Sequence, residues 1–308
     1  MRKLLAIILL ICVMTSCLSG CVISLDDTTR PVNNDNINNT QPDPENGEGT
    51  KPSNDATEPP VSKDVTVEET VLYDQNDVKI TLKSMSEGWL GMEFKLLVEN
   101  NTSHNIVLSA GLFVVNGITV SGSAYIDVAA GKKSNDELVF YTSELEQAGI
   151  TTISTVKAVD AYVFDSDTYE TMFDTPMEFA TSAVGYVQQI DDSGDVLMQE
   201  AGVTVTAKYI TDDIFGEALL LCVRNETGKD IVLTAENVSV NDYTVTAWLY
   251  EKIIDGTVRY STMYLFSSEM EKNDIDVVET IAFNLEVINA NTYDRIAESD
   301  EIVVRVGN

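Results

Sequence analysis

The chain has 308 residues and is strongly acidic, with 50 Asp and Glu against 19 Lys and Arg and a formal net charge of −31. Such an excess of carboxylates repels phosphate backbones and anionic lipid headgroups, which argues against nucleic-acid binding and against membrane attachment through a basic patch. Hydrophobic residues make up 44% of the chain, enough to build a folded core.

The N-terminus has the three parts of an export signal. Arg2 and Lys3 precede an apolar run over residues 4–13, and small residues follow at 19 and 20. That order is typical of a secretory signal peptide. A membrane-spanning helix needs roughly 20 apolar residues, and this run ends after about 15. We therefore predict a signal peptide over residues 1–20 rather than a transmembrane anchor.

The signal ends in a four-residue motif made of Leu18, Ser19, Gly20 and Cys21. This motif resembles the lipobox of bacterial lipoproteins, in which the cysteine thiol is alkylated with diacylglycerol and cleavage leaves the cysteine as the first residue. A second cysteine, Cys17, has a less suitable preceding sequence. The resemblance implies a protein outside the cytoplasm, tied to the bacterial cell membrane by acyl chains on Cys21. Two acyl chains suffice for stable anchoring.

The next segment, residues 21–64, begins with the lipidated cysteine and is poor in large apolar side chains. It is rich in Asn, Asp, Thr, Pro and Gly. Such a composition buries too little apolar surface to offset the entropy lost on ordering, so we expect a disordered linker. A linker of this length reaches at most roughly 140 Å when extended and about 35–40 Å as a coil.

The remaining sequence contains an internal repeat with a constant offset of 125 residues. Matching pairs include Gly91 and Gly216, Asn100 and Asn225, Asn116 and Asn241, and Ser143 and Ser268. A constant offset over so many positions indicates tandem duplication. We predict two copies, the first repeat over residues 65–183 and the second repeat over residues 184–308.

Each repeat has the pattern of short β-strands. Apolar and polar residues alternate over 78–82 and again over 203–207, which predicts strands with one buried face. Asn116 and Gly117 predict a hairpin turn of type I′. Residues 143–149 predict a short helix with Ser143 as N-cap, Glu146 completing a capping box and Gly149 at the C-terminus. The expected fold class is all-β, with two tandem immunoglobulin-like β-sandwiches.

A resemblance to a known group supports this expectation. The segments that carry it are 71–74, 78–82, 96–101 and 128–133, with 164–167 and 173–175. They resemble exported Gram-positive lipoproteins whose immunoglobulin-like domains are similar to the sandwich of the immunoprotective extracellular antigen. The resemblance covers both repeats and is weaker in the second. It implies fold and location and contributes no catalytic residues.

Candidate catalytic groups are few. After removal of the signal and lipidation of Cys21, the remaining thiol is Cys222, within an apolar strand. The single histidine, His104, lies in a polar connection, so Cys/His zinc sites and serine or cysteine triads lack partners. Ser154 and Lys157 match an S-x-x-K motif, but at the start of a predicted strand and without its companion motifs. We therefore predict that the protein is not an enzyme.

Two kinds of binding site remain open. Asp191, Asp192 and Asp195 lie in the turn between the repeats, where calcium would find hard oxygen ligands, although such clusters are also ordinary turn sequences. A group of aromatic residues offers either a recognition surface or core packing. Its members are Trp89, Trp248, Tyr250, Tyr260 and Tyr264. Apart from the acyl chains on Cys21 and calcium at the turn between the repeats as an open alternative, no cofactor is expected.

These observations favour a non-enzymatic module that binds, adheres or acts as a spacer at the cell surface. Its expected partners are the lipid bilayer, reached through the acyl anchor, and an envelope protein or glycan. The alternative is the substrate-binding lipoprotein of a transporter, which usually has two α/β lobes. The scarcity of long helical patterns counts against that alternative.

Overall fold

The computed structural model describes residues 30–33, 65–213 and 215–306. The predicted signal peptide, the lipobox and most of the linker lie outside the described residues. The described chain is all-β, with two short helices, α2 (Thr142–Gln147) and α3 (Ser267–Lys272). Within the described ranges, neither helix has the length and apolar character needed to cross a membrane.

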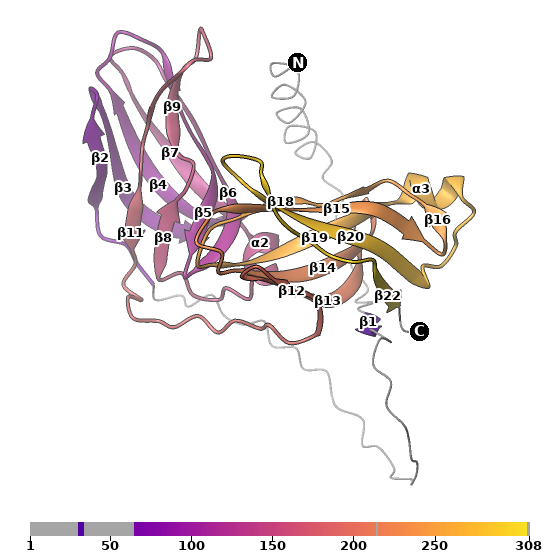
Figure 1. The fold of residues 1–308 in the computed structure, drawn as a ribbon. Coiled ribbons are helices and arrows are strands. Elements are labelled where there is room, and N and C mark those ends of the chain that lie inside the picture. Colours follow the sequence, from indigo (N-terminus) through magenta and orange to yellow (C-terminus); the bar gives the residue numbers. More distant parts are fainter. Residues whose placement is uncertain (1–29, 34–64, 214, 307–308) are drawn as a thin grey trace.

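The first repeat folds into two β-layers (Figure 1). Its strands are β2 (Thr70–Gln75), β3 (Val78–Glu87), β4 (Gly91–Asn100), β5 (Ile106–Val115), β6 (Ile118–Val128), β7 (Lys133–Tyr141), β8 (Thr155–Ala158), β9 (Tyr162–Asp165), β10 (Thr171–Asp174) and β11 (Glu178–Ala180). One layer has the order β2–β3–β4–β7. In the other, β5 pairs with β6 on one side and with β8 and β9 on the other. Apolar side chains from both layers form one continuous core.

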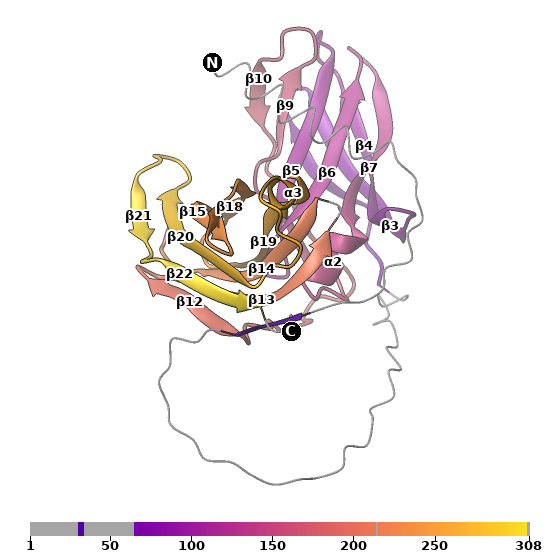
Figure 2. The same cartoon turned by 90° about the vertical axis from the view of Figure 1, so that its right-hand side faces the viewer.

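The second repeat has the same layered arrangement (Figure 2). Its strands are β12 (Asp195–Glu200), β13 (Val203–Asp213), β14 (Gly216–Asn225), β15 (Ile231–Val240), β16 (Tyr243–Thr244), β17 (Ala247–Trp248), β18 (Tyr250–Ile253), β19 (Val258–Phe266), β20 (Thr280–Asn289), β21 (Arg295–Glu298) and β22 (Ile302–Val306). One layer is β12–β13–β14–β19. The other has β15 between β18 and β20, with β21 and β22 on β20. A second, separate core lies between these layers.

Corresponding elements of the two repeats keep the offset seen in the sequence. Strands β4 and β14 begin 216 − 91 = 125 residues apart, and helices α2 and α3 begin 267 − 142 = 125 residues apart. The match extends to side chains, because Asn100 and Asn225 are fully buried and each donates its Nδ2 to the carbonyl four residues later, at 2.8 Å. The Nδ2 of Asn100 donates to the carbonyls of His104 and Val128, at 2.8 and 3.0 Å.

The short-range predictions were partly correct. Asn116 and Gly117 have φ of 53° and 84°, as the predicted β5–β6 hairpin requires. The predicted short helix is present as α2, but its N-cap is Tyr141 rather than Ser143, with no side-chain cap. The predicted capping box of Ser143 and Glu146 is therefore absent. The neighbouring Glu144 carboxylate accepts a hydrogen bond from the backbone N–H of Ser121, which joins the helix to β6. Gly149 follows the helix with φ of 62°, as expected.

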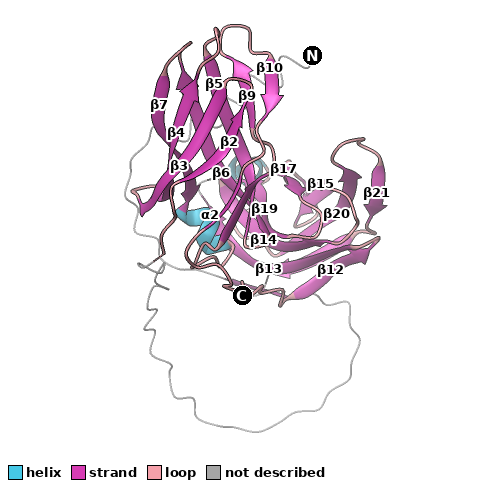
Figure 3. Ribbon diagram, turned by 90° about the vertical axis from the view of Figure 1, so that its left-hand side faces the viewer, coloured by secondary structure: helices cyan, strands magenta, loops and turns pink. Residues whose placement is uncertain are grey.

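The two repeats meet through buried polar contacts. Ile118 of β6 pairs with Val258 of β19, and the hydroxyls of Thr119 and Thr257 lie 2.7 Å apart in a buried position. Arg259 is 7% exposed, and its Nη2 donates to Ser121 Oγ at 3.0 Å. Figures 1 and 3 show the repeats set at an angle around this junction. These contacts join the two repeats through main chain and side chains.

Four residues of the predicted disordered linker form a strand in the structure. Arg30–Asn33 forms a strand, β1, rather than disordered chain. Arg30 and Pro31 pair with Ile210 and Tyr209 of β13, and Val32 and Asn33 pair with Val306 and Arg305 of β22. Amino-acid composition did not predict this strand, because the segment is ordered by main-chain pairing with a sheet edge that is distant in the sequence.

Candidate functional site

Two of the three carboxylates considered as calcium ligands, Asp191 and Asp192, are paired with basic side chains, and the third, Asp195, is the first residue of β12. The Asp191 carboxylate lies 3.0 Å from Lys208 Nζ and accepts from Ser193 Oγ at 2.5 Å. Asp192 lies 3.0 Å from Arg224. The Ser193 hydroxyl, followed by Lys208, lowers the pKa of Asp191. Among the described residues, no group of three or more His, Cys, Asp or Glu side chains converges on a metal-sized space.

His104 supports a turn. Its Nδ1 lies 2.7 Å from Asp165 Oδ2, and the histidine side chain is 55% exposed. Asp165 Oδ1 accepts the backbone N–H groups of Asp167 and Thr168 at 2.8 and 3.0 Å. These two backbone bonds are the main cause that lowers the pKa of Asp165. The histidine thus braces the β9–β10 turn.

The other nucleophile candidates lie in structural positions. Cys222 is 2% exposed within β14, and burial raises the pKa of its thiol to about 11. Ser154 is buried immediately before β8, where its backbone N–H donates to Asn116 Oδ1 at 2.8 Å. Lys157 lies on β8 itself. The S-x-x-K residues therefore occupy a strand rather than the helix start at which that motif works.

The aromatic residues singled out in the sequence have two different roles. Trp89 is 92% exposed at the β3–β4 turn, and Trp248 and Tyr250 are 52% and 50% exposed. Tyr260 packs against the core of the first repeat and donates its hydroxyl to the Asp191 carbonyl at 2.8 Å. Tyr264 packs edge to face on Phe215, with ring centroids 5.8 Å apart. Tyr260 therefore belongs to the junction, while the first three remain surface candidates.

A larger aromatic group lies on the outer face of the β6–β5–β9 layer in the first repeat. We call Tyr125, Tyr162, Phe164 and Tyr169 the aromatic surface. The pairing register places Tyr125 and Tyr162 on either side of Ser109. The Phe164 ring lies 6.2 Å from Tyr125, 6.1 Å from Tyr162 and 6.3 Å from Tyr169, the last pair stacked. Tyr125 and Tyr169 remain 50% and 76% exposed.

The aromatic surface also includes a buried apolar residue and exposed carboxylates. Val107 pairs with Phe164 and Asp127 on this outer face and is only 1% exposed. Asp127, which acts electrostatically on Tyr125, is an exposed carboxylate, and Glu170, the residue after Tyr169, is exposed as well. Burial is the main cause that raises the pKa of Tyr125, followed by Tyr169 and Asp127. The surface therefore combines ring faces, phenol hydroxyls and carboxylate acceptors.

Both repeats place an exposed tyrosine in the same unusual backbone conformation. Tyr169 and Tyr293 have φ of 60° and 62°, in the left-handed region that favours glycine or asparagine. They occupy equivalent turns, with the sequences DSDTYE (165–170) and NANTYD (289–294). Tyr293 is 68% exposed. Strained residues retained at the surface are candidates for function.

A second tyrosine is also repeated. Tyr125 corresponds to Tyr250 at the offset of 125, and each is 50% exposed. Tyr250 lies on β18 opposite Thr234 of β15, on the outer face of that layer, with Trp248 6.5 Å away. In Figures 1 and 2 the β6–β5–β9 layer and the β18–β15–β20 layer border the angle between the repeats. Each repeat thus carries exposed tyrosines on a corresponding sheet face.

The sequence analysis missed the aromatic surface for an identifiable reason. Its members come from β6, β9 and the turn after β9, so they are separated along the chain. The two tyrosine turns are 124 residues apart (293 − 169) rather than 125, which hides them from a search at constant offset. Aligning DSDTYE with NANTYD after a one-residue gap is the signal that finds them.

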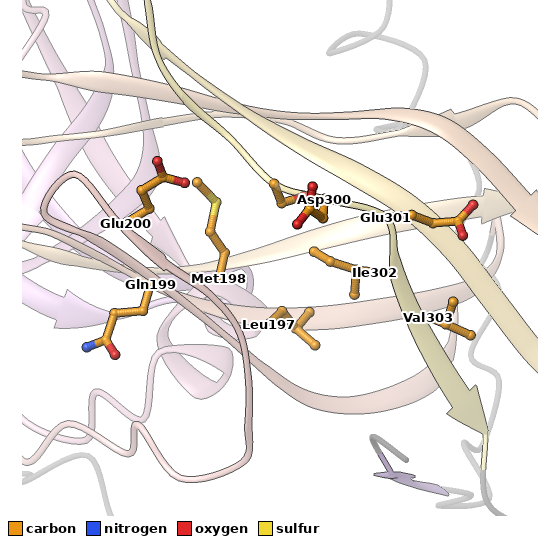
Figure 4. Close-up of a pocket in the computed structure, with 9 residues that line it drawn as sticks. Leu197, Met198, Gln199, Glu200, Asp300, Glu301, Ile302 and Val303 are labelled. Atoms are coloured by element: carbon orange, nitrogen blue, oxygen red, sulfur yellow. The ribbon is translucent and has the colours of Figure 1, made fainter. Parts of the chain in front are cut away.

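The two hollows of the described surface lack aromatic side chains in their linings. Figure 4 shows a pocket in which Leu197 and Met198 of β12 lie opposite Asp300 and Ile302. Its volume is about 250 Å³, below the roughly 300–1,000 Å³ typical of small-molecule sites. A second hollow of about 520 Å³ lies beside α3, where Glu217, Glu271, Asp274 and Asp276 contribute carboxylates. Neither hollow holds the ring faces of the aromatic surface.

Comparison with known proteins adds little. No family model matches the chain, and no curated protein matches it. A solved structure similar to it is the crystal structure of the conserved domain protein from Bacillus anthracis, at 12% identity and a TM-score of 0.28. The match covers 77% of this chain and 91% of that one. A likeness at this level carries no information about function.

Proposed function

We propose that the protein is a lipid-anchored, extracytoplasmic binding module without enzymatic activity, and that its aromatic surface recognises a neutral envelope glycan. One observation carries the choice of site: each repeat holds an exposed tyrosine at positive φ in the same turn, Tyr169 and Tyr293. Glycine or asparagine would fill those positions at lower cost. We therefore attribute the presence of tyrosine at these two positions to contact with a binding partner.

The chemistry of the aromatic surface favours a sugar. The C–H groups of a pyranose ring carry partial positive charge and pack on the electron-rich faces of aromatic rings. Sugar hydroxyls donate to carboxylates, and Asp127 is an exposed carboxylate close to Tyr125. With a net charge of −31, the chain repels anionic polymers. A neutral glycan satisfies all three conditions.

We propose further that the two repeats are immunoglobulin-like sandwiches with the boundaries 65–183 and 184–308. The supporting observations are two layers and one core in each repeat. Tandem repeats with equivalent tyrosines permit binding at two points of one extended chain, which raises avidity. The transporter alternative receives no support, because the described residues hold only two six-residue helices.

Co-sedimentation with isolated cell walls tests the proposed site. The protein used is residues 21–308 with Cys21→Ser, so that no lipid contributes. We expect this protein to co-sediment with the cell walls, and we expect its Tyr125→Ala/Tyr169→Ala variant to lose most of that binding. Trp89→Ala is the matched control, because Trp89 is 92% exposed but lies outside the aromatic surface. Equal binding by all three proteins would reject the site.

Fractionation of cells tests the anchor separately. Cys21→Ala should move the protein from the detergent phase to the aqueous phase, because the acyl chains provide the expected membrane affinity. Cys17→Ala should leave partitioning unchanged. Persistent detergent-phase partitioning of Cys21→Ala would contradict lipidation at that residue and leave the aromatic site untouched.

A further inference from the structure

The pairing of β1 has a consequence for how the protein is tethered. In the first repeat, the chain just before β2 closes the edge next to β11. There the Ser182 N–H donates to the Thr66 carbonyl at 2.7 Å, and the Thr66 N–H donates to Ser182 Oγ at 2.9 Å. The edge of the first repeat is therefore closed by the residues that immediately precede its own first strand.

The second repeat cannot close its edge in that way. The residue equivalent to Thr66 is Asp191 (66 + 125). Its backbone N–H and carbonyl are already hydrogen-bonded at the junction between the repeats. The Asp191 N–H donates to Tyr260 Oη at 3.0 Å, and its carbonyl accepts from Tyr260 Oη at 2.8 Å and Lys208 Nζ at 3.1 Å. The connection between the repeats therefore does not pair with β22, and the strand position beside β22 is open to another segment of the chain.

Strand β1 occupies that position. Val32 pairs with Val306 and Asn33 with Arg305 on β22, while Arg30 and Pro31 pair with β13 in the other layer. Val306 is the counterpart of Thr181 (306 − 125), the neighbour of Ser182. The four residues therefore bridge both layers of the second repeat at the edge that Thr66 closes in the first. Addition of an extended segment to an open sheet edge is a general mode of strand recognition.

We propose that Arg30–Asn33 is the closing strand of the second repeat, supplied by the same molecule from the segment that precedes the first repeat. The tether is then fixed to the second repeat instead of leading freely to the first. Together with the proposed lipid anchor on Cys21, on which this step rests, the pairing also limits the distance between the second repeat and the membrane. Nine residue steps separate Cys21 from Arg30, so this edge lies within roughly 30 Å of the bilayer. The first repeat is then joined to the membrane through the second.

Disulfide trapping tests the pairing in the mature chain, residues 21–308 with Cys21→Ser. Antiparallel partners have Cα separations of about 4.5–5.5 Å, within the range that a disulfide bridges. We expect Val32→Cys/Val306→Cys to form an intramolecular disulfide at least ten-fold faster than the control pair Val32→Cys/Ser182→Cys. Ser182 lies at the equivalent edge of the first repeat. Equal rates would overturn the assignment, and so would a disulfide-linked dimer that disappears on dilution.

Hydrogen exchange gives a second readout that does not depend on disulfide geometry. Val32→Pro/Asn33→Pro removes two main-chain N–H groups from β1 and should speed amide exchange about ten-fold at Arg305, the partner of Asn33. The Val306 N–H donates to the Glu279 carbonyl and should change less. The control Asn38→Pro/Asn39→Pro, elsewhere in the linker, should leave exchange at Arg305 unchanged. Unchanged exchange in both variants would overturn the proposal. Neither experiment involves lipid, so a failure here is distinct from a failure of the anchor, which the Cys21→Ala fractionation reports.

Discussion

Replacing Tyr293 by glycine tests whether the repeated tyrosines are held under backbone strain. A non-glycine residue in the left-handed region costs roughly 1–2 kcal/mol, and Tyr293 has φ of 62°. Glycine removes that cost but loses roughly 0.5–1 kcal/mol of chain entropy on folding. At the midpoint of these ranges, the net expectation for Tyr293→Gly is a gain of about 0.75 kcal/mol in the free energy of unfolding.

The same substitution at Tyr169 should give a smaller gain or a small loss. Tyr169 has φ of 60° but also stacks on Phe164 at a centroid distance of 6.3 Å. Aromatic pairs contribute about 0.5–1.5 kcal/mol, which offsets the relief of strain. In the described chain, Tyr293 has no ring partner of this kind. The difference between the two variants therefore measures the Tyr169–Phe164 stack.

Calorimetry of residues 21–308 with Cys21→Ser can resolve these effects. For a repeat of this size, 1 kcal/mol corresponds to a shift of about 4 °C in Tm, so Tyr293→Gly should raise the Tm by about 2–4 °C. Tyr243→Gly is the matched control: Tyr243 is 52% exposed in a strand and lacks a positive φ, so glycine should lower the Tm there. If Tyr293→Gly lowers the Tm as Tyr243→Gly does, the tyrosines are not strained, and the reason for assigning them a function is lost.

Two further predictions concern buried groups. Burial raises the pKa of Glu251 above its ordinary 4.5, and Arg259 opposes this shift; the stability that Glu251 contributes is then fully present below pH 4.5 and is lost as the pH rises through the raised pKa. The free energy of unfolding of Glu251→Gln should therefore increase relative to wild type between pH 4 and pH 7, and a relative decrease would contradict the pKa direction. Burial also raises the pKa of Cys222 to about 11, so a thiol reagent at pH 8 should label it only as fast as the second repeat unfolds; stoichiometric labelling of the native protein would show that the thiol is accessible.

The sequence predicted the parts of the fold that local patterns determine. Alternation over 78–82 and 203–207 identified strands, and the dipeptide at Asn116 identified a hairpin turn. The offset of 125 residues predicted corresponding elements in the two halves. These features depend on side-chain period and turn conformation, which a few neighbouring residues determine.

The features that sequence reasoning missed depend on long-range packing. Strand β1 lies in a segment of disordered composition and is ordered by pairing with β13 and β22, more than 170 residues away. The helix α2 begins at Thr142 after Tyr141 and has no side-chain cap, and its Glu144 carboxylate accepts from Ser121 of β6, a contact outside the helix that the local sequence does not reveal. The aromatic surface forms only when β6 and β9 flank β5. Calcium binding at Asp191 was an open possibility, and the structure places Lys208 against that carboxylate.

The most direct test of the account is affinity electrophoresis of residues 21–308, with Cys21→Ser, through gels containing purified envelope polysaccharides. We predict that a neutral polysaccharide retards the protein, that an anionic one does not, and that Tyr125→Ala/Tyr169→Ala removes most of the retardation while Trp89→Ala preserves it. Undiminished retardation after loss of both tyrosines, or retardation only by anionic polymers, would contradict recognition of a neutral glycan by the aromatic surface.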